Sequence, residues 1–114
     1  MIKVRSKLLR RGSQIPFKVF REGGKEHYNV RIQLDAEPEE LTKIKSVEYQ
    51  LHDSFRNPTR ISNDRDSQFS IEIWTWGMFE IAVTIHLDGG RRETLTHHMK
   101  FSLPSDDGSN YVQV

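Results

Sequence analysis

Apolar and polar residues alternate along most of this chain. Between residues 69 and 87 the odd positions are largely apolar: Phe69, Ile71, Ile73, Phe79, Ile81, Val83, Ile85 and Leu87. Successive side chains of a β-strand point to opposite faces, so this period of two predicts strand with one buried face. The same period recurs in four shorter runs, which are therefore also predicted strands: 15–19, 29–34, 47–51 and 95–103.

The run from 69 to 87 is too long for one strand, because strands usually have about 3–10 residues. Its alternation is interrupted at Thr75, Trp76 and Gly77, and glycine permits backbone dihedral angles that other residues avoid. We therefore expect two strands joined by a loop at these residues. Trp74 and Trp76 fall on the otherwise polar face, with Trp74 in the incoming strand and Trp76 in the loop.

Turn signals separate the predicted strands. Glycine pairs occur in Glu22-Gly23-Gly24-Lys25 and Asp88-Gly89-Gly90, and the second is typical of a β-hairpin. Only residues 36–45 could form a helical turn or two. Many short strands without intervening helices predict an all-β fold, an antiparallel sandwich of two sheets with about seven or eight strands. We expect a single domain over 1–114, with a core of about 15–103 and a loose polar tail at 104–114.

The composition narrows the classes of function. Of 114 residues, 35% are hydrophobic and 29% charged, and no apolar run approaches the ~18 residues of a membrane span. The chain contains no cysteine, so disulfides and thiolate chemistry are excluded, and a cytoplasmic location without a membrane partner is expected. No cofactor motif is present, and we predict no cofactor.

Positive charge is concentrated in the first third of the chain. Residues 1–31 hold two glutamates and nine basic residues, a net charge of +7: Lys3, Arg5, Lys7, Arg10, Arg11, Lys18, Arg21, Lys25 and Arg31. Such a stretch favours contact with nucleic acid, with Trp74 and Trp76 stacking on bases. The simpler interpretation is that these side chains cover the solvated faces of early strands.

The segment 47–60, VEYQLHDSFRNPTR, combines a strand pattern with a loop rich in chemically useful side chains. His52, Ser54 and Phe55 fall within four residues, and Asn57-Pro58 ends the segment. Taken with the loop at 75–81, TWGMFEI, this segment resembles the YEATS domain family, above all its prokaryotic branch. The resemblance extends over roughly residues 28–103.

The resemblance implies an immunoglobulin-like sandwich that binds an acylated lysine, of the acetyl or crotonyl type, on a partner protein or peptide. It implies that the acyl chain lies between the rings of Phe55 and Trp76. Ser54 would hydrogen-bond the acyl amide, and His52 would line the same pocket. The remaining implied contacts come from the backbone N–H of Trp76, beside Gly77, which would meet the acyl carbonyl, and from Phe79, which would support the loop. Thr75 stands where the eukaryotic loop usually begins with glycine, and Trp74 is an additional aromatic residue.

Other functions remain open from the residues alone. An aromatic pocket with an acid nearby, Asp53 or Glu80, would suit methylated lysine. His52 and Ser54 with Asp64 or Asp66 as orienting group would suggest hydrolysis, but no nucleophile elbow accompanies them, so we expect no enzyme. His97 and His98 point to opposite faces of a strand, which is poor geometry for one metal ion. A third alternative is an adaptor domain that binds another protein and reads no modification.

Overall fold

The computed structural model describes residues 2–19 and 24–114, and this part of the chain contains nine strands and very little helix. In chain order the strands are β1 (Lys3–Leu8), β2 (Ile15–Val19), β3 (Glu26–Asp35), β4 (Ile44–Gln50), β5 (Thr59–Ser62), β6 (Ile71–Thr75), β7 (Phe79–Leu87), β8 (Arg92–Met99) and β9 (Tyr111–Gln113). The helical elements are α1 (Pro38–Leu41) and the single 3-10 turns η1 (Arg65–Ser67) and η2 (Asp88–Gly90). No helix in the described ranges is long and apolar enough to cross a bilayer.

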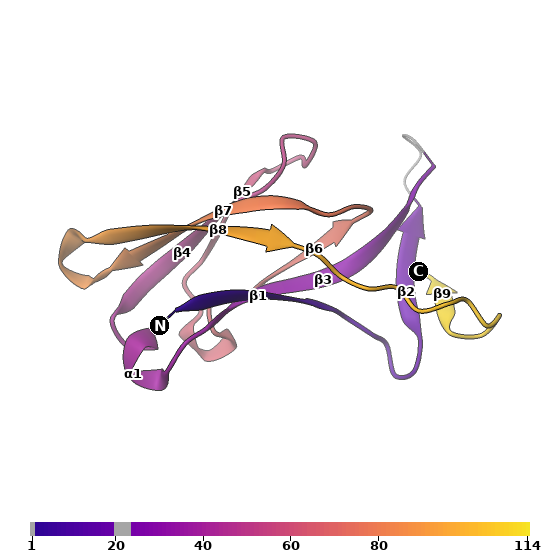
Figure 1. Cartoon of the computed structure of the whole chain (residues 1–114), viewed down its shortest axis with the longest axis horizontal. Coiled ribbons are helices and arrows are strands. Elements are labelled where there is room, and N and C mark those ends of the chain that lie inside the picture. The colour runs from indigo at the N-terminus through magenta and orange to yellow at the C-terminus, as the bar shows by residue number, and fades with distance from the viewer. Residues whose placement is uncertain (1, 20–23) are drawn as a thin grey trace.

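The strands form two sheets, as predicted (Figure 1). One sheet has the order β1-β3-β2-β9, with β6 paired to β3 as well, and we call it sheet A. The other, sheet C, has the order β5-β4-β7-β8. Pairing is antiparallel except between β2 and β9, which run parallel. Because β6 belongs to sheet A and β7 to sheet C, residues 76–78 carry the chain from one sheet to the other.

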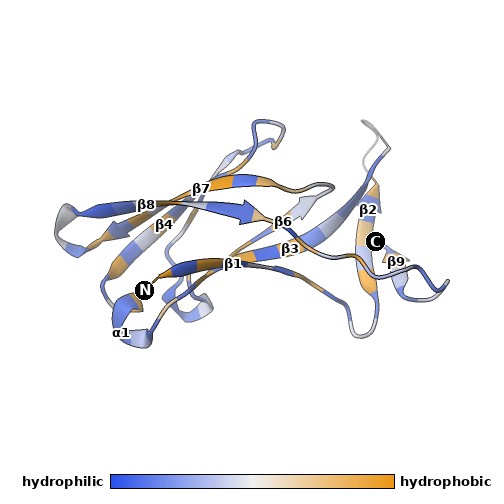
Figure 2. Cartoon of the chain, viewed as in Figure 1, coloured by the Kyte–Doolittle hydropathy of each residue, from blue (hydrophilic) through white to orange (hydrophobic). Residues whose placement is uncertain are grey.

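The core consists of the alternating apolar residues of both sheets (Figure 2). Its fully buried members include Val30, Ile32 and Leu34 from β3 and Ile81, Val83 and Ile85 from β7. Tyr49 of β4 is buried with its hydroxyl donating a hydrogen bond to the carbonyl of Phe69. Burial explains why the pKa of Tyr49 is raised, and the hydrogen bond satisfies its one polar atom.

The predicted break in the long apolar run is confirmed, since β6 ends at Thr75 and β7 begins at Phe79. The hairpin at 88–90 and the restriction of α-helix to residues 36–45 are confirmed as well. Residues 22 and 23 of the turn predicted at 22–25 lie outside the described ranges, and so does Arg21.

Three strands of the described part, β1, β5 and β9, lie outside the six runs predicted from alternation and bring the number to nine, where about seven or eight were expected. In β1 the alternation KVRSKL is present but its outward positions are lysine and arginine, so charge obscured the strand signal. In the segment predicted to be a loose tail, residues 111–113 form β9, because β2 offers it an unpaired edge. The strand β5 has only four residues.

Candidate ligand-binding site

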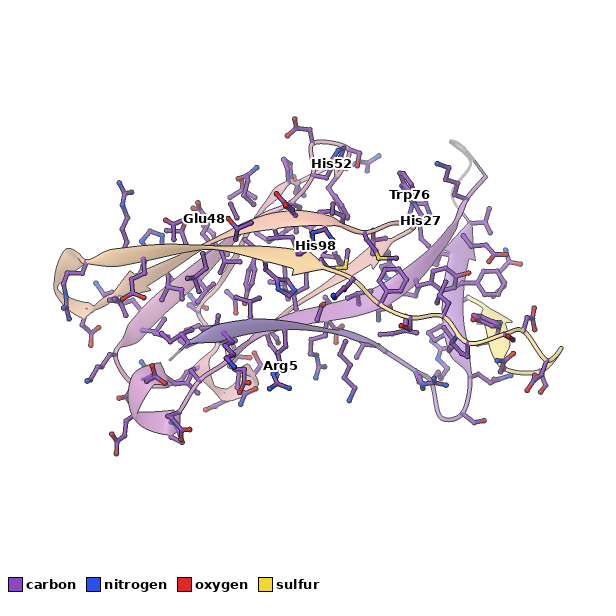
Figure 3. The ribbon with its side chains drawn as sticks, in the orientation of Figure 1. Arg5, His27, Glu48, His52, Trp76 and His98 are labelled. Carbon is purple, nitrogen blue, oxygen red and sulfur yellow. The ribbon has the colours of Figure 1, made fainter. Side chains whose placement is uncertain are left out.

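The two loops singled out in the sequence lie at the same end of sheet C, as predicted. Gln50, the last residue of β4, pairs with Ala82, so the loop after β4 emerges beside the start of β7. Residues 76–78 lead directly into that start. In Figure 3 His52 and Trp76 accordingly lie on the same side of the molecule.

The loop after β4 is held by its own backbone hydrogen bonds. The N–H of Leu51 donates to the carbonyl of Pro58 at 2.6 Å and closes the base of the loop. Near the tip, the N–H of Phe55 donates to the carbonyl of His52 at 3.0 Å, which forms a tight turn. Proline cannot extend a strand ladder, and Pro58 therefore marks the point where the chain turns back into β5.

His52 and Ser54 form a small hydrogen-bonded unit within this turn. The backbone N–H of Ser54 donates to His52 Nδ1 at 3.1 Å, and Ser54 Oγ lies 2.9 Å from the same nitrogen. Because Nδ1 accepts the N–H, it carries no proton, and the serine hydroxyl must donate to it as well. The lone pairs of Ser54 Oγ are thereby left as acceptors for another group, and the imidazole presents Nε2–H.

Phe79 connects the two loops. Its ring centre lies 5.4 Å from that of Phe55 and 6.2 Å from that of His52, within the range of favourable tilted and edge-on aromatic contacts. Phe55 and Phe79 are both partly buried and pack against the core. Phe55 thus also closes the core beneath its loop, while the His52 side remains exposed.

The loop 76–78 is shaped by Thr75. The side chain of Thr75 is buried at the end of β6, where its hydroxyl donates to the carbonyl of Gly77 at 3.1 Å and accepts the N–H of Gly77 at 3.3 Å. This double contact gives Thr75 a role in the loop that a residue without a side-chain hydroxyl could not fill. Gly77 does not use the conformational freedom that glycine permits, since its φ is not positive, and an added Cβ would meet open space.

Each tryptophan carries a lysine on its ring face. Lys25 Nζ lies 3.7 Å from the ring centre of Trp76, and Lys18 Nζ lies 4.5 Å from that of Trp74. Trp76 is 52% exposed, and Phe55 makes its ring contact with Phe79 rather than with Trp76. Neither lysine could be predicted as a partner of these rings from local pattern, because both lie some fifty residues earlier in the chain.

The alternative arrangements considered from the sequence, a hydrolytic triad and a histidine pair, have the following geometry. His52 follows β4 beside the start of β5, whereas Asp64 and Asp66 follow the opposite end of β5, so no serine–histidine–aspartate arrangement forms. His97 is half-buried with Nε2 3.3 Å from Ser6 Oγ, and its pKa is lowered by burial and then by His98. Among the described residues no group of three or more histidine, aspartate or glutamate side chains could hold a metal ion.

Both acids proposed for a cation cage are exposed. Glu80 points away from the core on β7, with Oε1 4.0 Å from His98 Nδ1, and Asp53 is exposed at the tip of its loop. A cation, the ammonium of Lys25, lies over the ring of Trp76.

Comparisons with known proteins agree with this geometry. Residues 28–100 match the prokaryotic YEATS domain. Transcription initiation factor TFIID subunit 14b of Arabidopsis thaliana is 37% identical over 67 residues, which cover 56% of this chain but only 24% of that protein. The chain therefore spans about a quarter of the length of this relative.

Solved structures of the YEATS domain of yeast Yaf9 are similar in fold. The domain bound to H3K27ac superposes with a TM-score of 0.61 at 18% identity, covering 91% of this chain and 76% of that chain. The domain recognising an H3K122suc peptide gives 0.58 at 18% identity, covering 88% and 75%. The family match covers most of the chain and includes both loops of the candidate site. The chain therefore belongs to the prokaryotic YEATS domain family.

Proposed function

We propose that this domain is a non-enzymatic reader module that binds an acylated lysine side chain between Phe55 and Trp76. The observation that carries the proposal is the junction at Phe79, whose ring holds the loop of His52, Ser54 and Phe55 against the start of β7. In the same fold, Yaf9 YEATS domains are described bound to H3K27ac and recognising an H3K122suc peptide.

The hydrogen-bonding groups suit a neutral amide. The hydroxyl of Ser54 donates a hydrogen bond to His52 Nδ1, so its oxygen can accept the N–H of an acyl amide. In this proposal the backbone N–H of Trp76 donates to the acyl carbonyl. The loop that carries this N–H is held in place by the two bonds between Thr75 and Gly77, so little ordering is needed on binding.

The positive charge of Lys25 should make this site prefer a neutral ligand to a cationic one. The ammonium of Lys25 already lies over the indole of Trp76, and a second cation on this ring would meet a like charge. An acylated lysine carries no charge on its amide and avoids this repulsion. An acyl chain that takes the place of the ammonium on the ring loses only about 0.5–1 kcal/mol of cation–π contact, and Lys25 stays close enough to repel a cationic ligand in the same position.

The affinity of a single side chain should be low. Burying roughly 150 Å² of lysine stem and acyl group contributes about 4 kcal/mol at ~25 cal/mol/Å², whereas association costs ~4–15 kcal/mol. We therefore expect dissociation constants of about 10 μM to 1 mM, with contacts to the flanking peptide supplying the rest of the binding free energy.

A panel of matched peptides that differ only at one lysine tests the proposal. We expect acetylated or crotonylated peptide to bind at least about fivefold tighter than unmodified or trimethylated peptide, because two like charges a few ångströms apart in water repel by about 1 kcal/mol. Titrations followed by NMR shifts of Trp76 and Phe55 would measure this.

The variant Lys25→Met provides the matched control for charge. It should narrow the preference for acylated over trimethylated peptide, because the repelling cation is gone while the length of the side chain is similar. Tighter binding of trimethylated than of acetylated peptide by the parent protein, read from the shifts of Trp76 and Phe55, would contradict the neutral-amide proposal. If none of the peptides binds, an adaptor role becomes the better explanation.

Gly77→Ala tests whether the ligand approaches the backbone of this loop. The added methyl group meets no atom within 4 Å and φ is not positive, so stability should be unchanged or rise by up to about 1 kcal/mol. Affinity for acetylated peptide should nevertheless fall about tenfold, or ~1.4 kcal/mol, because the methyl group narrows the space over the Trp76 N–H. Thermal melts and titrations measure the two effects, and an unchanged affinity would place the ligand elsewhere.

A second candidate function is binding of nucleic acid on the outer face of sheet A. Lys7 and Arg31 are direct cross-strand partners, and Lys18 packs on Trp74 on the same face. Two of the arginines on this face are paired with acids, Arg5 with Asp35 and Arg31 with Glu72. Binding of a single-stranded oligonucleotide that weakens steeply with salt, without any response to acylated peptide, would favour this function.

A further inference from the structure

Sheet A extends beyond the part that sheet C covers. The main core cluster includes Val30, Ile32 and Leu34 of β3 but not Tyr28, which is buried two positions earlier on the same face. Tyr28 instead contacts Phe101 and Tyr111, at ring-centre distances of 6.2 and 6.1 Å. The segment after β8 crosses this overhanging end of sheet A and returns as β9 (Figure 1).

A pocket of about 200 Å³ lies between the overhanging end and the crossing segment. Its lining residues come from β2, β3, the crossing segment and β9: Phe17, Glu26, Tyr28, Pro104, Asp106 and Tyr111. Three of these six are aromatic, and the rings of Tyr28 and Tyr111 meet at 67°, so they form two walls at a steep angle. The volume is below the ~300–1,000 Å³ typical of pockets for whole small molecules and suits a single head group.

Two carboxylates complete the lining, and no lysine or arginine is among the lining residues. Glu26 Oε2 accepts the hydroxyl of Tyr28 at 2.6 Å, and Asp106 Oδ1 accepts the N–H of Gly108 at 2.8 Å. Each carboxylate therefore keeps one oxygen outside these bonds. Both aromatic hydroxyls respond to this negative charge: the pKa of Tyr28 is raised by burial and then by Glu26, and that of Tyr111 by burial and then by Asp106.

Among the residues that the structure describes, Arg10 acts on this pocket by lowering the pKa of Tyr111. It is exposed and does not line the pocket. Aromatic faces together with carboxylates attract cations, and a weakly hydrated alkylated ammonium group gains most from such a lining, because it loses little hydration on entry.

We propose that the pocket of Phe17, Tyr28 and Tyr111 with Glu26 and Asp106 binds an alkylated ammonium head group. No residue that lines this pocket belongs to the loops at the end of sheet C, and the charge preference of the pocket is opposite to theirs. The reader would then contact a neutral acylated lysine at one place and a methylated cation at another. Two sources of the head group share this chemistry, a methylated lysine of a polypeptide and a free quaternary ammonium compound.

The test uses tetramethylammonium chloride and a trimethyl-lysine peptide as probes, with NMR shifts of the Tyr28 and Tyr111 rings as the readout. Sodium chloride at equal ionic strength controls for salt. We expect both probes to give saturable shifts, with dissociation constants of about a millimolar or below. Tighter binding of the peptide than of tetramethylammonium identifies a polypeptide source, and the reverse order identifies a free compound.

Asp106→Asn is the decisive variant, because asparagine keeps an oxygen acceptor for the Gly108 N–H and removes only the charge. It should weaken binding of both probes about fivefold, the effect of one unit charge at contact distance in water. Asp53→Asn makes the same charge change at the tip of the other loop and should leave these shifts unaltered. Tyr111→Phe keeps the ring and should retain binding.

The proposal is overturned if neither probe shifts the two tyrosine rings, or if Asp106→Asn binds as tightly as the parent. A loss caused by Asp53→Asn instead would move the cation to the loops at the end of sheet C. Failure here is distinguishable from failure of the reader function, because Asp106→Asn should leave the affinity for acetylated peptide unchanged.

Discussion

Replacing Trp76 with alanine should abolish measurable binding of acetylated peptide while lowering the free energy of unfolding by no more than about 0.5 kcal/mol. The indole is 52% exposed in a three-residue loop, and its ring contact is the flexible ammonium of Lys25, so the fold loses little. The proposed ligand, in contrast, loses one of its two aromatic walls. Peptide titration and thermal melts on the same sample separate the two effects.

Trp74→Ala is the matched control. Trp74 is half-buried on β6, opposite Asn29 and beneath Lys18, so its loss should cost about 1 kcal/mol of cross-strand packing. Binding should stay within a few-fold of the parent, because this ring lies on the outer face of sheet A and not in the loop. If Trp76→Ala unfolds the domain or binds as well as the parent, the indole is a structural cover and the proposed site is wrong.

Of the substitutions considered, Phe69→Ala should cost the most stability, about 3–5 kcal/mol of unfolding free energy. Phe69 is fully buried in the core between the two sheets, and the methyl group of alanine leaves a cavity that the surrounding strands cannot close. Small domains have only about 5–15 kcal/mol in total, so a large share is lost. Chemical denaturation monitored by tryptophan fluorescence would measure it.

Two further variants make the Phe69 result interpretable. Ile61→Ala removes an apolar side chain that is 65% exposed on β5, and it should change stability by less than about 0.5 kcal/mol. Phe69→Leu keeps most of the volume and tests the same position if Phe69→Ala cannot be purified folded. A loss below about 1 kcal/mol for Phe69→Ala would show that this ring is not a main element of the core.

The strands that carry the site could be predicted from local pattern. The alternation at 79–87 places Ile81, Val83 and Ile85 on one face, and the structure buries all three. The end of β6 at Thr75 followed from the same pattern, because a strand that changes sheets must interrupt its alternation. A period of two is a property of consecutive residues, and the sequence displays it directly.

Terminal strands were harder to predict, because their signal depends on a partner. The segment 111–113 has no distinctive pattern of its own and becomes β9 only where β2 leaves an edge open. In β1 the outward residues are Lys3, Arg5 and Lys7, and Arg5 is placed there by Asp35 of β3, thirty residues later. Such pairing depends on which strands become neighbours.

Within the candidate site, the residue types and their two loops were determined by the sequence alone: a histidine, a serine and a phenylalanine after one strand, and a tryptophan and glycine between two others. Tertiary structure decided which rings touch. It joins Phe55 to Phe79, and it places Lys25 on Trp76 across 51 residues of chain. It also gathers Glu26, Asp106 and Tyr111 around one pocket. Alternation records which face of a strand is buried, whereas contacts between distant side chains follow from how the two sheets pack and where one extends past the other.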